Sequence, residues 1–239
     1  MFAGPNGSGK TTLKSKLPSS LLGIYLNPDE IEQRIREQRS LDFSAYRVHA
    51  VADETLKFFA ESSFLKERRQ DDKVAGLGFA EGRLNFADAA ENSYLALVAV
   101  EFLRQKLLAQ KMTFTFETVM SHQSKVDFLM QAQTAGYRTY LYFVATDDPA
   151  INISRVRNRI QLGGHAVPEE KIVPRYYHSL DLLIHAIRHT NRAYIFDNSG
   201  DSANGSQTWL AEITDGKRLE LKTNRIPSWF ARAVLDKIK

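Results

Sequence analysis

The stretch Gly4-Pro-Asn-Gly-Ser-Gly-Lys-Thr11 decides the fold of this chain of 239 residues. It matches the pattern G-x-x-x-x-G-K-[ST], whose glycines let backbone N–H groups approach a polyphosphate closely. In that pattern Lys10 contacts the β- and γ-phosphate oxygens, and the hydroxyl of Thr11 binds Mg²⁺. Residues 10–17 have the character of a helix that Pro18 ends, and a helix start behind the loop favours anion binding. The sequence therefore predicts a phosphate-binding loop for ATP and Mg²⁺.

The composition limits the class of protein. Thirty-two Lys and Arg against 28 Asp and Glu give a net charge of +4, which suits phosphate-rich ligands without singling out nucleic acid. The absence of cysteine excludes disulfides, thiolate metal sites and a Cys nucleophile. No apolar run reaches the length of about 18 residues that a membrane span needs, and the first residues do not resemble a signal peptide. We expect a cytoplasmic protein with no membrane partner.

Short apolar runs alternate with helical patterns, which is typical of an α/β fold with a mostly parallel central sheet flanked by helices. Strands are expected at 23–26, 112–116, 138–145 and 193–196. Asn27-Pro28 and Asp148-Pro149 each look like an N-cap followed by proline at the first helical position. Gly136 is expected to end a helix that starts near Gln123. With the loop, this pattern predicts a P-loop NTPase fold of the kinase type, as one domain over residues 1–239.

Two regions extend this plan. The segment of about residues 40–110 is longer than a simple crossover connection between strands needs. Its apolar residues have helical spacing, which predicts a helical insertion. Within 205–239, the runs 209–214 and 218–223 flank Asp215-Gly216-Lys217, which predicts a hairpin, and Pro227 is expected to open a terminal helix. Only three residues precede Gly4, whereas the strand before such a loop usually has about five.

Acidic residues follow two of the predicted strands, where ligands of α/β sheets bind. Asp29 is placed to accept the proton of an attacking hydroxyl. The alternative is structural, because Asn27 and Glu30 form a capping-box pattern in which Asp29 only favours the helix dipole. Glu117 and Thr118 end the strand at 112–116, where the carboxylate would bind a substrate hydroxyl or a water on Mg²⁺, or serve as an ordinary strand-end residue.

An arginine-rich segment at about 155–175 predicts a lid. Arg155 and Arg159 share a helix face by their i,i+4 spacing, and a Gly163-Gly164 pair precedes a second helix that begins at Pro168. Such lids bring guanidinium groups onto the transferred phosphoryl group and exclude water, and Arg175 is placed to join them. The alternative is a solvated basic helix.

Asn198 follows the last parallel strand, a position beside the purine in nucleotide kinases, although a plain turn explains it equally well. The residues expected to bind the nucleotide are Gly4, Asn6, Gly7, Ser8, Gly9, Lys10, Thr11, Thr12 and Asn198.

Taken together, these blocks resemble the zeta toxin family of P-loop kinases. The matching segments occur in the family's order over about residues 1–200: Gly4–Thr12, Asn27–Ile31, Phe116–Thr118, Gly136–Ala145, Arg157–Glu169, Arg175–Leu180 and Phe196–Ser199. The resemblance implies an ATP-dependent kinase of a UDP-amino-sugar, such as UDP-N-acetylglucosamine, that acts as a toxin with an antitoxin partner. It also implies these roles: phosphate and Mg²⁺ binding by Lys10 and Thr11, general base Asp29, sugar-nucleotide contact by Glu117, and phosphate clamping by Arg159 and Arg175.

Two other functions stay open at this point. One is a nucleic-acid end kinase, suggested by a pI near 9.2. The other is a nucleotide-binding regulatory protein without a phosphoacceptor.

Overall fold

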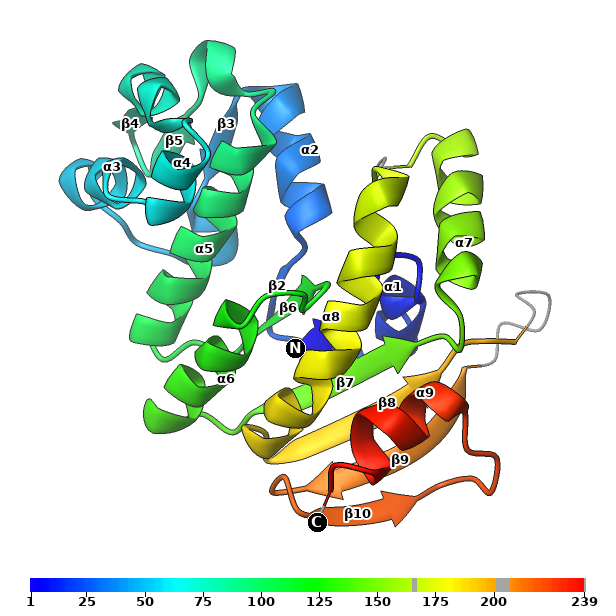
Figure 1. Ribbon diagram of the computed structural model, residues 1–239. Helices are drawn as coiled ribbons and strands as arrows, with labels where there is room; N and C mark the ends of the chain where they lie inside the picture. Colours follow the sequence, from blue (N-terminus) through cyan, green and yellow to red (C-terminus); the bar gives the residue numbers. More distant parts are fainter. Residues whose placement is uncertain (165–166, 201–206, 239) are drawn as a thin grey trace. The chain divides into compact units, whose positions relative to one another are not determined.

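The computed structural model describes residues 1–164, 167–200 and 207–238 (Figure 1). In it, the strand that leads into the phosphate loop, β1 (Phe2–Ala3), is hydrogen-bonded to a strand on each side. The chain divides into two compact units, Met1–Pro18 with Glu117–Lys239, and Ser19–Phe116. We call them the first and the second unit. No helix in the described ranges combines the length and apolarity that crossing a membrane requires.

The first unit is built on a sheet in the order β10-β9-β8-β7-β1-β6. Its strands are β6 (Phe114–Thr118, of which the last two residues belong to this unit), β7 (Tyr140–Ala145), β8 (Arg192–Asp197), β9 (Thr208–Thr214) and β10 (Arg218–Leu221). The pairs β6–β1, β1–β7 and β7–β8 are parallel, whereas β8–β9 and β9–β10 are antiparallel. The predicted hairpin is therefore confirmed as β9–β10, and the predicted mostly parallel sheet is confirmed as well.

The helices of the first unit are α1 (Lys10–Lys14), α6 (Ser124–Thr134), α7 (Pro149–Gln161), α8 (Glu169–Arg188) and α9 (Ser228–Phe230), which a π-helical turn (Ala231–Leu235) extends. Of these, α8 packs against α6, α7 and the C-terminal turn (Figure 1). Asp148 caps α7 through its side chain, which accepts from Ala150 N at 2.7 Å, as expected before Pro149. The helix behind the loop ends at Lys14, three residues earlier than predicted.

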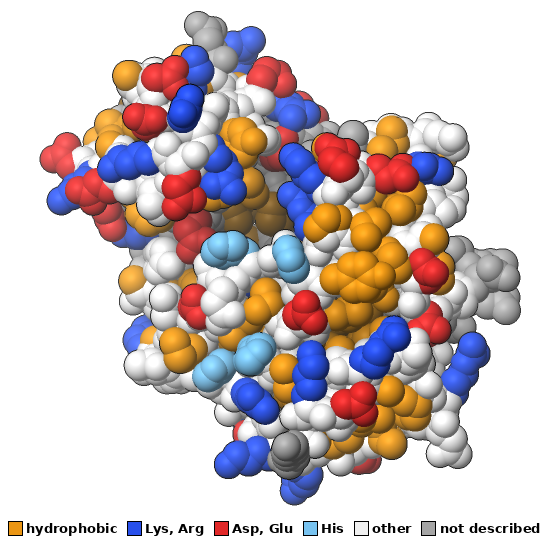
Figure 2. Space-filling model, viewed as in Figure 1, with side chains coloured by type: hydrophobic (Ala, Val, Ile, Leu, Met, Phe, Trp, Pro, Cys, Tyr) orange, Lys and Arg blue, Asp and Glu red, His pale blue; other side chains and the backbone are white. Residues whose placement is uncertain are grey.

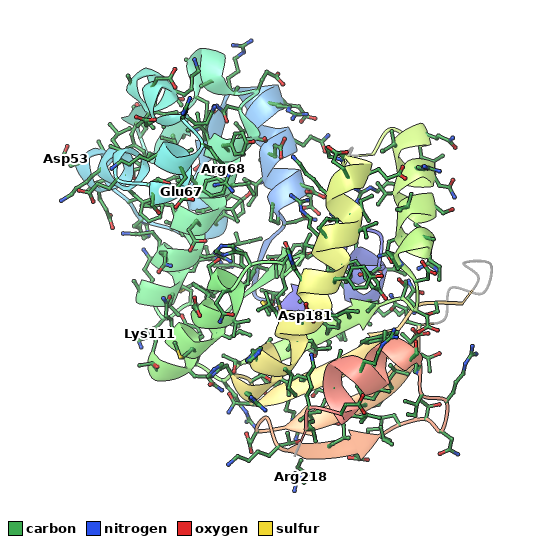
Figure 3. All side chains as sticks on the ribbon, viewed as in Figure 1. Asp53, Glu67, Arg68, Lys111, Asp181 and Arg218 are labelled. Atoms are coloured by element: carbon green, nitrogen blue, oxygen red, sulfur yellow. The ribbon has the colours of Figure 1, made fainter. Side chains whose placement is uncertain are left out.

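The second unit contains β2 (Ile24–Leu26), which pairs in parallel with the first three residues of β6. Helices α2 (Pro28–Gln38), α3 (Ala52–Ala60), α4 (Ser63–Glu67) and α5 (Ser93–Ala109) supply most of its core. Phe102 of α5 lies 5.3 Å from Phe43 and 5.1 Å from Phe58 between ring centroids. Arg68, labelled in Figure 3, follows α4 directly. Its guanidinium lies 4.0 Å from the ring centre of Phe64.

The predicted insertion is helical in α3, α4 and α5, but it also holds a small antiparallel sheet in the order β3-β5-β4 (Ser40–Asp42, Arg83–Asn85, Gly78–Ala80). The sequence did not indicate this sheet, because three-residue strands are too short to display an alternating pattern. The strand predicted at 112–116 begins two residues later, as β6. Glu117 and Thr118 are the last two residues of β6, so they end the strand as predicted.

Gly23 offers a test of how tightly β2 is packed on β6. Its φ is +59°, and a Cβ there would lie 2.4 Å from the carbonyl oxygen of Thr113. Gly82 has a similar φ of +76° with open space around it. We expect Gly82→Ala to lower the free energy of unfolding by about 1 kcal/mol, the cost of left-handed backbone, and Gly23→Ala by about 3 kcal/mol because backbone atoms must also shift. Equal losses in denaturant unfolding would contradict the close contact.

Candidate phosphate-binding site

The loop between β1 and α1 takes a backbone path that only glycine allows at three positions. Gly4, Gly7 and Gly9 have φ values of +138°, +74° and +98°. A Cβ on Gly4 would lie 2.0 Å from the carbonyl oxygen of Val144 in β7, so no other residue fits between the two strands. The first hydrogen bond of α1 runs from Leu13 N to Gly9 O. The N–H groups between Gly9 and Leu13 therefore lie ahead of the first hydrogen bond of the helix. In an anion-binding loop such groups point at the anion.

Asn152 of α7 holds the loop from one side. Its side chain is fully buried, and its Nδ2 donates to the carbonyl oxygen of Asn6 at 2.6 Å. Its Oδ1 in turn accepts from the hydroxyl of Thr146, which is also buried. A Cβ on Gly7 would lie 2.7 Å from Asn152 O, so the glycine lets α7 approach the loop closely. Because both polar ends of this amide are satisfied, it can stabilise the loop without an unpaired buried group.

Asn198 and Gln207 hold the loop from the other side. Asn198 Nδ2 donates to Ser8 O at 2.7 Å, and Gln207 Nε2 donates to Gly9 O at 2.8 Å. A Cβ on Gly9 would lie 2.4 Å from Asn198 Nδ2, which explains why glycine is needed there. Arg155 donates to Asn198 O at 2.8 Å and thereby fixes the segment after β8. Asn198, predicted to contact the nucleotide, thus contacts the loop itself, and a contact with the base stays a prediction.

The ammonium group of Lys10 lies against the loop. Its Nζ donates to Gly4 O at 2.8 Å and to Pro5 O at 3.0 Å. The flexible four-carbon chain of lysine allows the same group to swing onto a phosphate bound in the loop.

Thr11 and Glu117 come together through the strand register. Phe2 of β1 pairs with Glu117 of β6, so the carboxylate lies beside the start of α1. The hydroxyl of Thr11 donates to the two carboxylate oxygens at 3.4 and 3.5 Å, and Glu117 is buried. Mg²⁺ in nucleotide sites takes oxygen ligands, with one or two carboxylates and substrate phosphates. This donor set fits such an ion, although the described residues contain no cluster of three or more His, Cys, Asp or Glu side chains.

Thr118, expected to bind substrate, uses its side-chain oxygen to accept from Met120 N at 3.0 Å. This bond shapes the turn that leaves β6. Its role toward a substrate stays a prediction.

The predicted lid corresponds to the end of α7 and the first part of α8, with residues 165 and 166 outside the described ranges. Arg157 joins the two helices through an ion pair with Glu169 at 2.6 Å. Gly164 N donates to Arg159 O, and a Cβ on Gly164 would lie 2.6 Å from Arg159 Cγ, so this glycine leaves room for the arginine. Arg159 and Arg175 are both half-buried, and their approach to a phosphate stays a prediction.

Asp29 lies in the second unit, in the first turn of α2. Asn27 caps the helix by accepting from Asp29 N at 3.0 Å, and its Nδ2 donates to Glu30 Oε1 at 3.0 Å. Asn27 is therefore confirmed as the N-cap of α2, but Glu30 contacts the side-chain amide of Asn27 and not its backbone N–H as in a capping box. The Asp29 carboxylate is exposed, and no hydrogen bond or ion pair engages it within the described part of the chain. Its predicted role as a base, and its distance from the loop, stay predictions.

The comparisons with known proteins point to one fold. No family model matches the chain. An uncharacterized protein of Haemophilus influenzae is 23% identical over 177 residues, which covers 73% of this chain and 89% of that protein. A chain of the AvrRxo1-ORF1:AvrRxo1-ORF2 complex crystallised with ATP aligns with a TM-score of 0.55 at 12% identity, over 99% of this chain and 62% of that one. The complex crystallised with sulphate ions gives 0.51 at 12% identity, over 93% and 60%.

At this identity the likeness shows the fold alone, and the chain spans about three fifths of the length of those solved chains. It supports the predicted α/β fold, in which helices flank a mostly parallel central sheet, as an architecture that this chain shares with those solved structures.

The contact of Asn152 with the loop can be tested without any ligand. Asn152→Ala removes the donor to Asn6 O, and we expect the free energy of unfolding to fall by about 2 kcal/mol, the cost of an unpaired buried carbonyl. Backbone amides of residues 4–9 should also exchange hydrogen faster. Asn158→Ala, at an exposed position of the same helix, is the matched control. The same loss and the same exchange in both variants would show that Asn152 does not support the loop.

Proposed function

We propose that this protein is an ATP-dependent kinase that transfers the γ-phosphoryl group to a hydroxyl of a small substrate. The observation that carries the proposal is the loop 4–11, whose Thr11 hydroxyl lies 3.4 Å from a buried carboxylate oxygen of Glu117. A hydroxyl and a carboxylate beside a phosphate loop are the protein ligands that a nucleotide-bound Mg²⁺ needs. The fold it shares with a complex crystallised with ATP supports the same conclusion.

In this proposal the first unit binds the nucleotide. Amides of the loop surround the β-phosphate, and Lys10 leaves the carbonyl oxygens of Gly4 and Pro5 for the β- and γ-phosphate oxygens. Thr11 and Glu117 hold Mg²⁺, which neutralises charge on the phosphate oxygens when bound. This contact with Thr11 favours a metal role for Glu117 over the sugar contact that the family resemblance implies.

In the proposed chemical step, Asp29 accepts a proton from the substrate. The substrate oxygen forms a bond to the γ-phosphorus as the bond to the departing ADP oxygen breaks, and the hydroxyl proton passes to the Asp29 carboxylate. Arg159 and Arg175 stabilise the charge on the transferred group. The carboxylate of Asp29 is exposed, and the capping bond to Asn27 uses the backbone N–H of Asp29 and not its carboxylate. Both observations support this assignment.

The acceptor and the partner rest on the family resemblance. It favours a UDP-amino-sugar as the acceptor and a toxin whose activity an antitoxin restrains. The solved AvrRxo1-ORF1:AvrRxo1-ORF2 structures are complexes of two proteins, which supports a protein partner for this chain.

A nucleic-acid end kinase is less well supported. Basic and acidic side chains are interspersed over the second unit on the face that Figure 2 shows, with no continuous basic stripe there. Backbone binding to DNA or RNA relies on such stripes. A regulatory protein that binds ATP without transfer would retain the loop but show no phosphorylated product.

Lys10→Ala should lower kcat/KM for ATP by about 10²-fold or more, because a charged donor to the transferred phosphoryl group is lost. Turnover with radiolabelled ATP and a panel of nucleotide sugars measures this. Lys14→Ala, one turn along the same helix, should retain activity. A Lys10→Ala protein as active as Lys14→Ala would rule out the loop as the nucleotide site.

Asp29→Asn should leave the Kd for ATP unchanged and slow transfer by about 10²-fold or more, the usual contribution of a general base. Single-turnover kinetics and calorimetry separate the two quantities. Glu37→Gln, near the other end of α2, controls for the lost charge. If the Asp29→Asn rate equals that of the control, Asp29 only serves the helix start.

A further inference from the structure

The second unit contains a cavity of about 650 Å³ whose lining includes none of the residues assigned to the kinase site. It lies along β2 and α2, and the segments before β2 and before β6 complete it. Its size falls in the range of pockets that enclose small-molecule ligands, roughly 300–1,000 Å³. The side chains that matter for its chemistry are Glu30, Arg34, Tyr46, Arg47 and Thr113.

Two arginines, Arg34 and Arg47, line this cavity. Among the described residues, no ion pair engages the guanidinium of Arg34 or Arg47. Arg36, two residues further along α2, lies outside the cavity and pairs with Glu32 at 2.6 Å and with Glu91 at 3.2 Å. The cavity therefore presents two guanidinium groups that are not neutralised, and such groups bind carboxylates and phosphates well.

Tyr46 adds an oriented hydroxyl. The residue is only 6% exposed, and its phenol oxygen accepts from Arg34 Nη1 at 3.2 Å. The Arg34 guanidinium also lies 5.9 Å from the ring centre. Burial raises the pKa of Tyr46 above the ordinary tyrosine value, at which the hydroxyl already keeps its proton at neutral pH. Because this oxygen already accepts from Arg34, its own proton can be donated to an anion in the cavity.

One acid faces the same space. Glu30 Oε1 accepts from Asn27 Nδ2 at 3.0 Å, which orients the carboxylate on the first turn of α2. A carboxylate held in this way can accept from a sugar hydroxyl, and the hydroxyl of Thr113 offers a further polar contact. The cavity therefore combines groups for an anion with groups for uncharged polar atoms.

We propose that this cavity binds a small phosphorylated molecule that also carries hydroxyl groups, with its phosphate on Arg34, Arg47 and Tyr46 and a hydroxyl on Glu30. Every residue of the site lies outside the phosphate loop, so the proposal stands whether or not the chain is a kinase. The ligand is either the phosphoacceptor or an effector, since both share this chemistry.

The test uses the full chain carrying Lys10→Ala, which weakens anion binding in the phosphate loop. Glucose 1-phosphate, inorganic phosphate and uncharged glucose are titrated by calorimetry. We expect glucose 1-phosphate to bind more tightly than either of the other two. Arg34→Gln and Arg47→Gln should each raise its Kd by about tenfold or more, as expected for a lost charged hydrogen bond. Tyr46→Phe, which retains the ring, should raise it by about fivefold.

Arg36→Gln is the matched control, because it removes the same charge from the same helix outside the cavity. Its Kd should stay within about twofold of the parent value. Unfolding curves of all variants check that the fold persists. The proposal is overturned if none of the three probes binds below about 10 mM, or if Arg34→Gln and Arg47→Gln bind as Arg36→Gln does. In the chain with Lys10 intact, ATP-dependent phosphorylation of glucose 1-phosphate that Arg34→Gln slows identifies an acceptor site. A change in ATP turnover without phosphorylation of the probe identifies an effector site.

Discussion

The phosphate loop depends on different partners for its backbone N–H groups and for its carbonyl oxygens. In a loop that binds an anion, most N–H groups face the anion, so the carbonyl oxygens need partners elsewhere. Side-chain amides of Asn152, Asn198 and Gln207 supply them, at 2.6, 2.7 and 2.8 Å. Asn152 lies in α7, Asn198 follows β8, and Gln207 directly precedes β9. The loop is therefore shaped by elements distant in sequence, and its glycines are needed where those elements approach most closely.

Each unit brings together residues to which we assign a role. In the first unit, parallel pairing of β1 with β6 brings Thr11 of α1 to Glu117, which creates an oxygen-ligand pair beside the loop. In the second unit, α2 carries Asp29 and also Glu30 and Arg34, two of the residues that line the cavity of about 650 Å³. We infer that the first unit binds the nucleotide and metal, whereas the second supplies the base and a place for a phosphorylated ligand.

Much of the plan could be predicted from the sequence, because its signals are local. The loop motif, the Asn27-Pro28 and Asp148-Pro149 helix starts and the Asp215-Gly216 hairpin each depend on a few adjacent residues. Asn152 was missed, although an asparagine four residues before the buried Val156 is a visible signal on an amphipathic helix. Gln207, the β3-β5-β4 sheet and the pairing state of Arg34 and Arg47 could not be predicted, since each depends on long-range contacts that leave no pattern in the chain.

A crystal structure of the full chain with Mg²⁺ and a non-hydrolysable ATP analogue tests the central claim most directly. The account predicts the β-phosphate inside the loop 4–11, with Lys10 Nζ moved from the carbonyl oxygens of Gly4 and Pro5 onto the phosphates. It also predicts Mg²⁺ beside Thr11 and Glu117. The three hydrogen bonds from side-chain amides to the carbonyl oxygens of the loop should be retained. An analogue bound elsewhere, with Lys10 still on those carbonyl oxygens, would contradict it.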